Sequence, residues 1–172
     1  MSRAAPARDG RFSFSDEQEE FRRVVLRFLE DVSPAPEVRR LSETEAGFEP
    51  AVWRRLCEEL ALPGLHLPEE FGGQGFGAVE LAVALEETGR ALLCAPYFSS
   101  AVLAGTAILE AASEPQKKEL LPAIAAGATR ATLALSEPAC AWDPAGVALT
   151  ATPGAGSYRL DGVKTLVPDG HT

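Results

Sequence analysis

A glycine-rich loop is the first stretch of this 172-residue chain whose residue types could do chemistry. Residues 72–77 read Gly-Gly-Gln-Gly-Phe-Gly, a composition that invites comparison with nucleotide-binding loops. The spacing is not the G-x-G-x-x-G of dinucleotide sites, no predicted strand precedes it, and no acid follows at the required distance. We therefore expect a tight turn between two helices.

The acidic pairs and the histidines form no catalytic constellation. Glu69–Glu70 and Glu86–Glu87 are adjacent in sequence, and adjacent residues on a helix or loop do not converge on one point, so we expect surface acids. His66 and His171 each lack a Cys, Asp or His at metal-ligand spacing. No Ser-His-Asp or G-x-S-x-G pattern occurs either. We assign no catalytic residue and no metal site.

Two apolar runs with polar punctuation lie near the C-terminal end. Leu133–Pro138 (Leu-Ala-Leu-Ser-Glu-Pro) ends in a hydroxyl, an acid and a proline. Asp161–Val167 (Asp-Gly-Val-Lys-Thr-Leu-Val) is a turn that leads into a second apolar run. Taken alone, the first run indicates a buried strand that enters a proline turn. Its functional interpretation depends on the elements that precede it.

The first 127 residues have helical periodicity. Ser15 with Gln18, and later Ser113 with Gln116, have the spacing of capping boxes that open helices. The expected helices cover residues 16–32, 50–60, 78–88 and 98–112, and a last one runs from the second capping box to Gly127. Between them, the pattern predicts a stop at Pro34 and Pro36, a polar connector at 42–47 and a structured loop at 62–77.

The periodicity changes after Gly127. Short apolar or β-branched runs at 131–135, 147–152 and 158–160 indicate strands. The predicted fold class is α+β, with an N-terminal all-α helical domain followed by the first strands of a β-barrel-like middle domain. The expected division is a disordered leader at 1–11, the helical domain at 12–127 and an incomplete β domain at 128–172.

Composition and charge exclude several classes of protein. The chain is 46% apolar, enough for a core, and its 16 basic and 25 acidic residues give a net charge of −9, which disfavours nucleic acids and anionic membranes. No apolar run approaches the roughly 20 residues of a membrane helix, and the N-terminus has no secretory apolar region. Cys57, Cys94 and Cys140 match neither disulfide nor zinc spacing, so we expect a cytoplasmic protein.

The order of several motifs resembles that of the acyl-CoA dehydrogenase family from Phe14 onward. The similar stretches are Phe-Ser-Asp-Glu-Gln-Glu at 14–19, Pro-Glu-Glu-Phe-Gly-Gly-Gln-Gly at 68–75, Leu-Glu-Glu-Thr-Gly at 85–89 and the helix from 116 to 127. Each motif is moderately specific, and together they cover nearly the whole chain. The ending Val-Pro-Asp-Gly at 167–170 is similar to a bacterial branch that includes heteromeric dehydrogenases acting on large acyl-CoA thioesters.

The resemblance implies an FAD-dependent α,β-dehydrogenation of an acyl-CoA thioester. In the family a carboxylate takes the α proton while the β hydrogen leaves as hydride to flavin N5, and FAD lies between the β domain and a C-terminal helical bundle. No acid of this chain matches that carboxylate. The positions implied to bind the flavin are Leu133, Leu135, Ser136, Trp142, Leu166, Val167 and Pro168. Homo- or hetero-oligomerisation and an electron-transfer flavoprotein are the implied partners.

Three of these positions differ from the family pattern, one conservatively and two with a change in chemistry. Ser136 replaces the usual threonine and keeps its hydroxyl. Trp142, however, stands where the family has a small serine that contacts both FAD and acyl-CoA. The indole is much larger than that serine, so we expect the substrate pocket to be either rebuilt or blocked. Pro168 replaces a threonine and has neither a hydroxyl nor a backbone N–H.

The resemblance leaves three functions open. The chain can be the front portion of an FAD-dependent acyl-CoA dehydrogenase, inactive alone because the catalytic base lies beyond residue 172. Trp142 and Pro168 favour instead a non-catalytic partner subunit of a heteromeric dehydrogenase with a degenerate flavin site. A same-fold flavin oxidase or monooxygenase is the third possibility. Whether the full-length protein carries FAD by itself, or only with a second polypeptide, separates the first two.

Overall fold

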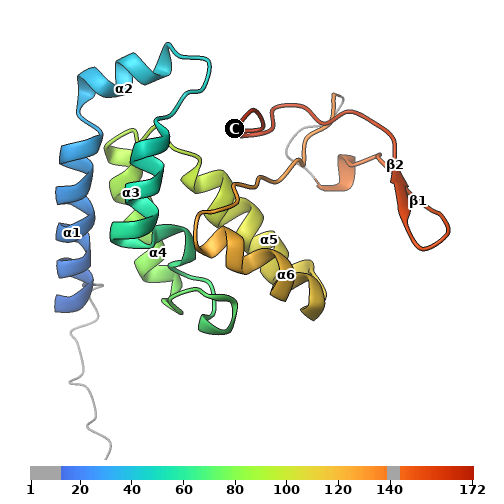
Figure 1. Cartoon of the computed structure of the whole chain (residues 1–172), viewed down its shortest axis with the longest axis horizontal. Helices are drawn as coiled ribbons and strands as arrows, with labels where there is room; N and C mark the ends of the chain where they lie inside the picture. The colour runs from blue at the N-terminus through green and yellow to red at the C-terminus, as the bar shows by residue number, and fades with distance from the viewer. Residues whose placement is uncertain (1–12, 139–143) are drawn as a thin grey trace, which may run out of the picture.

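The structure is a computed structural model that describes residues 13–138 and 144–172 (Figure 1). Its helices are α1 (Asp16–Val32), α2 (Ala35–Ser42), α3 (Pro50–Leu60), α4 (Ala78–Arg90), a π-helix (Phe98–Gly105) that continues into α5 (Thr106–Ala111), and α6 (Glu114–Ala125). Strands β1 (Ala151–Pro153) and β2 (Tyr158–Leu160) follow. The described chain is thus a helical domain with two strands at its C-terminal end, as predicted. The expected leader at 1–11 and Trp142 lie outside the described residues.

Both predicted capping boxes are present. At the start of α1 the Gln18 backbone N–H donates to Ser15 Oγ at 3.2 Å, and the Ser15 N–H donates to Gln18 Oε1 at 2.9 Å. At α6 the Ser113 backbone N–H donates to Gln116 Oε1 at 3.0 Å, and the Ser113 hydroxyl donates to the same oxygen at 2.8 Å. Each box satisfies backbone donors that the first helical turn cannot use, which is why these two starts are readable in the sequence.

The main hydrophobic core lies between α1, α3, α4 and the start of the π-helix. Val25 on α1, Leu56 on α3 and Ala84 on α4 are each 0% exposed, and Tyr97 lies among them at 2%. A second cluster joins the 62–77 loop to α6 through Leu67, Phe71, Leu121 and Ala125. The helices therefore bury their apolar faces against one another and against this loop.

The 62–77 loop is a structured turn, as predicted. It contains two short 3₁₀ turns, Leu62–Gly64 at its start and Glu69–Phe71 near its middle. The backbone N–H of Gln74 crosses the loop to the Gly64 carbonyl at 2.9 Å. A Cβ at Gly73 would collide with the Leu67 carbonyl oxygen, so only glycine fits there. The glycines make this turn compact.

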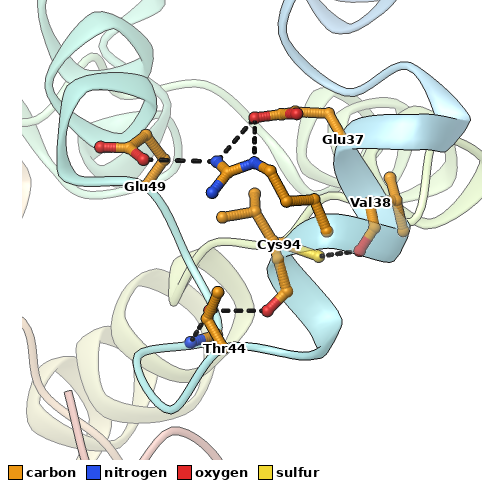
Figure 2. Close-up of polar contacts among 8 residues, drawn as sticks. Glu37, Val38, Thr44, Glu49 and Cys94 are labelled. Atoms are coloured by element: carbon orange, nitrogen blue, oxygen red, sulfur yellow. Dashed lines mark hydrogen bonds and ion pairs between the residues drawn. The ribbon is translucent and has the colours of Figure 1, made fainter.

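Helix α2 was missed in the sequence, because two prolines were expected to end helical structure at 34–36. Pro34 is the N-cap residue and Pro36 lies in the first turn, where a missing N–H costs no helical hydrogen bond. Two carboxylates hold the helix through Arg40, which lies 2.6 Å from Glu37 and 3.5 Å from Glu49. Figure 2 labels both glutamates. The Cys94 thiol, from the segment before the π-helix, lies 3.9 Å from the Val38 carbonyl oxygen.

The prediction of surface acids is wrong at Glu87. Its side chain is 5% exposed and lies 2.8 Å from the guanidinium groups of both Arg22 on α1 and Arg90 on α4. The neighbouring Glu86 stays exposed and also pairs with Arg22, at 2.8 Å. Adjacent residues on a helix point in different directions, so α4 turns Glu87 toward α1 and Glu86 toward water. A buried carboxylate requires such partners; α4 itself supplies Arg90, and packing against α1 supplies Arg22.

The strand predictions are confirmed only in part. Residues 158–160 form β2, and the 147–152 run contributes only its end to β1. The two strands pair antiparallel, Thr152 opposite Arg159, and all six residues are exposed. Residues 131–135 belong to no strand. A strand needs a ladder of backbone hydrogen bonds to a neighbouring strand, whereas Ala131, Thr132 and Leu135 form hydrogen bonds that each involve a side chain.

Candidate functional site

The two apolar runs of the sequence lie side by side. We call residues 131–138 and 161–169 the paired segments. The backbone N–H of Thr165 in the second segment donates to the Ser136 carbonyl oxygen in the first at 2.8 Å. This contact brings together two stretches that are almost thirty residues apart in the sequence. Figure 1 shows both segments between the helical body and the β1–β2 ribbon.

A carboxylate and an ammonium group lock the paired segments together. Glu137 Oε1 lies 2.7 Å from Lys164 Nζ, and the same ammonium group donates to the Leu135 carbonyl at 3.1 Å. Glu137 also accepts the backbone N–H groups of Ala148 at 2.9 Å and Leu149 at 3.0 Å. The hydrogen bond from Lys164 first, and then the two backbone N–H groups, lower the pKa of Glu137 to about 2. Glu137 therefore acts as a fixed anion that ties three parts of the chain.

Two of the predicted flavin-binding residues present apolar side chains to the outside. Leu133 is 38% exposed and Leu166 is 80% exposed. Leu166 also has a φ of 50°, a left-handed conformation that is strained for a bulky residue. Ser136 is 5% exposed, so its hydroxyl is removed from bulk water and needs a partner from the protein or a ligand.

The other predicted residues are partly buried or lie outside the description. Leu135, Val167 and Pro168 have intermediate burial. The Pro168 carbonyl oxygen already accepts a hydrogen bond from the Thr132 hydroxyl at 2.7 Å, so this residue offers little polar capacity to a ligand. Trp142, predicted to contact both flavin and substrate, belongs to residues 139–143, outside the described residues.

Two adjacent serines of the π-helix fasten the paired segments to the helical domain. Ser99 Oγ lies 2.5 Å from Asp169 Oδ2, at the end of the second segment. Ser100 Oγ accepts the backbone N–H of Ala131, at the start of the first segment, at 3.2 Å. Both serines are 0% exposed. A π-helix is rare and often occurs at functional sites, and here it supplies both anchoring hydroxyls.

From the sequence, no role was assigned to the polar residues that hold the paired segments. The detectable signal was charge inside apolar runs: Glu137 and Lys164 interrupt stretches that otherwise read as buried strands. For Ser99 and Asp169 no sequence signal existed, because they are 70 positions apart and only the fold brings them together.

An apolar cavity of about 370 Å³ lies between the end of α4 and the start of the π-helix. Its lining includes Leu85, Leu92, Phe98 and Tyr97. The Tyr97 hydroxyl is buried and has no hydrogen-bond partner among the described residues. Burial raises the pKa of this phenol, which keeps it neutral.

The described residues contain neither a metal-ligand cluster nor a membrane-spanning helix. Within residues 13–138 and 144–172, no three His, Cys, Asp or Glu side chains gather as a metal site would require. Across the same residues, no helix has both the length and the apolarity to cross a bilayer.

The fold is that of a helical N-terminal domain that leads into the start of a β region. The sequence profile described as "Acyl-CoA dehydrogenase, N-terminal domain" matches residues 15–128, well over half of the chain. The chain therefore belongs to the acyl-CoA dehydrogenase family, as the motif order predicted.

Three proteins are similar to this chain in sequence or in structure. "Acyl-CoA dehydrogenase IpdE2" of Mycolicibacterium smegmatis is 38% identical over 106 residues, which are 62% of this chain and 34% of that protein. The ChsE4–ChsE5 complex from Mycobacterium tuberculosis matches with a TM-score of 0.78 and 26% identity, over 90% of this chain and 41% of the other. An acyl-CoA dehydrogenase complexed with FAD from Bacillus anthracis matches with a TM-score of 0.79 and 29% identity, over 90% and 26%.

The match covers less than half of each relative. It spans 34% of the mycobacterial dehydrogenase and 41% of the matched chain of the ChsE4–ChsE5 complex. Structural neighbours include both a heteromeric complex and an FAD-bound enzyme, so flavin and a partner subunit are both represented among them.

Proposed function

We propose that this chain supplies the helical body and the first flavin-facing segments of an FAD-dependent acyl-CoA dehydrogenase, which oxidises an acyl-CoA thioester at its α,β bond. The observation that carries the proposal is the pairing of residues 131–138 with 161–169 on the helical domain. The contact from Thr165 to Ser136 at 2.8 Å aligns the two runs that the family uses to face the flavin. The domain boundary at Gly127 belongs to the same proposal.

The described residues fit the ring face of a flavin better than its polar edge. Leu133 and Leu166 expose apolar side chains that can cover an aromatic ring system. Ser136 carries a hydroxyl that can donate or accept. Pro168 cannot donate, and Thr132 already occupies its carbonyl oxygen. The residues that would hold the group are therefore Leu133, Ser136 and Leu166.

The role of this chain is positioning. Bound FAD would supply the hydride acceptor, while the side chains named above cover and orient its ring and keep water from it. The Glu137–Lys164 pair, with its 2.7 Å contact, holds both segments in one register. We assign no catalytic base to this chain.

The visible absorption spectrum tests the proposal, with the 172-residue chain and a longer version purified side by side. The longer version is expected to carry a flavin band near ~450 nm. Leu166→Lys should remove the band, because an ammonium group replaces an apolar contact. Tyr158→Lys on β2 is the matched control, since Tyr158 is also exposed, at 71%, and lies outside the paired segments. An unchanged band in Leu166→Lys would contradict the assignment of this residue.

A second candidate is a partner subunit that completes another subunit's site and holds no flavin of its own. Pro168 favours it, because this position has no N–H and its carbonyl is engaged by Thr132. The ChsE4–ChsE5 complex is a heteromeric neighbour. Purification of the longer protein without flavin, followed by appearance of the flavin band after co-expression with a second dehydrogenase subunit, would favour this function over the first.

A further inference from the structure

The contact between Ser99 and Asp169 is the shortest polar link between the helical domain and the paired segments. The hydroxyl and the carboxylate oxygen are 2.5 Å apart, within the range of an O–H donor bound to an ionised acceptor. Ser99 is 0% exposed and lies in the π-helix, while Asp169 is half-buried. The donor is thus held by the core and the acceptor by a surface segment.

The Ser99 hydroxyl has a second acceptor within reach. It lies 3.2 Å from the Pro96 carbonyl oxygen, and it has one proton to donate. The carboxylate is charged and closer than the Pro96 carbonyl, so it is the favoured acceptor of this hydrogen bond. If Asp169 is removed, the hydroxyl can turn to Pro96, so the π-helix itself loses little. The cost of removal falls on the segment that carries Asp169.

The segment that carries Asp169 has two residues in the left-handed backbone conformation. Leu166 and Asp169 both have a φ of 50°, and they flank Val167 and Pro168. Left-handed conformations at residues other than glycine are strained and persist where surrounding contacts support them. Local turn contacts, from the Gly170 N–H to the Val167 carbonyl at 3.2 Å and from Thr172 to the Asp169 carbonyl, support them within the segment. Thr132 on Pro168 at 2.7 Å and Ser99 on Asp169 tie the segment to the rest of the chain.

We propose that Ser99 and Asp169 are a positioning pair that sets residues 166–168 against the flavin. The proposal rests on the proposed function and adds two residues to it. Neither side chain touches the reacting atoms; they act through the backbone of Leu166 to Pro168. Ser99 would couple the π-helix to the flavin-facing segment, so a change at either residue displaces the Leu166 side chain.

Amide hydrogen exchange on the 172-residue chain tests the link first. Asp169→Ala and Ser99→Ala should each raise exchange at residues 165–170 about tenfold, as loss of a hydrogen bond to a charged group implies. Asp169→Asn keeps an acceptor oxygen and should restore much of the protection. The double variant should exchange no faster than either single one, because both lose the same bond. Unchanged exchange in the single variants would overturn the pair.

FAD titration of the longer protein, after its flavin has been removed, tests the positioning role. Asp169→Ala should raise the FAD dissociation constant about tenfold and shift the flavin band, with the melting temperature of the helical domain unchanged. Asp169→Asn should restore both readouts. Faster exchange with unaltered FAD affinity and spectrum would make the link merely structural and overturn the proposal. If the wild-type protein binds no FAD in any assembly, the proposed function fails, and the positioning role fails with it while the exchange result still stands.

Discussion

The helical domain and the paired segments are held by opposite means. In the helices, side chains such as Val25, Leu56 and Leu121 are 0% exposed and form continuous apolar cores. In the C-terminal region Leu160 and Leu166 are 66% and 80% exposed, and individual polar contacts fix the backbone. The comparison shows a scaffold held by apolar packing and adjoining segments held by a few directed bonds. Such segments can be altered without unfolding their support.

The largest difference is expected between two leucine truncations. Leu56→Ala should destabilise the protein by about 2–5 kcal/mol, because it opens a cavity in the main core. Leu166→Ala should change stability by less than about 0.5 kcal/mol, since the side chain is 80% exposed. Urea unfolding followed by circular dichroism measures both. Equal losses for the two variants would show that the paired segments share the helical core.

Gly127 follows the end of α6 and should tolerate no side chain. Its φ is +69°, and a Cβ would collide with the Cys57 sulfur, while its carbonyl accepts the Trp53 indole N–H at 2.9 Å. Gly127→Ala should cost about 1–3 kcal/mol. Gly89→Ala is the matched control, because no atom lies within 4 Å of a Cβ there. Thermal melting of the pair should separate them; a neutral Gly127→Ala would disprove the strain.

Tyr97→Phe should stabilise the helical core. The Tyr97 hydroxyl is buried with no partner among the described residues, and removing an unsatisfied buried hydroxyl should add about 1 kcal/mol. Tyr158→Phe, at a residue that is 71% exposed, should leave the melting temperature unchanged. A lower melting temperature in Tyr97→Phe would mean that the hydroxyl has a partner, such as a buried water.

The smallest effect on global stability is expected from pH at Glu137. Its folded pKa is about 2, below the ordinary 4.5, so its contribution is complete above about pH 4.5 and is lost as the pH falls toward 2. Exchange of the Ala148 and Leu149 amides should therefore lose protection over that interval. Glu137→Gln should flatten this dependence, whereas the exposed Glu119→Gln should not. A dependence that persists in Glu137→Gln would assign it to another group.

The predictable parts of the fold are those set by local chemistry. The capping boxes at Ser15 and Ser113 and the turn at Gly73 are confirmed because each depends on residues within a few positions. Helix α2 was missed although its rule is also local, since Pro36 was taken as a stop instead of a first-turn residue. The strand at 131–135 was wrong because pairing depends on a distant neighbour.

The sequence by itself determined the family, the helical domain and the two runs that pair at the candidate site, because motif order and periodicity are properties of the chain. Only the tertiary structure decided that Glu87 is buried between Arg22 and Arg90, and that Ser99 meets Asp169. The contacts of Glu87 with Arg22 and of Ser99 with Asp169 join positions that are 65 and 70 residues apart. Neither periodicity nor spacing encodes them; they exist because helix packing brings charged and hydroxyl groups together away from water, where each needs a partner.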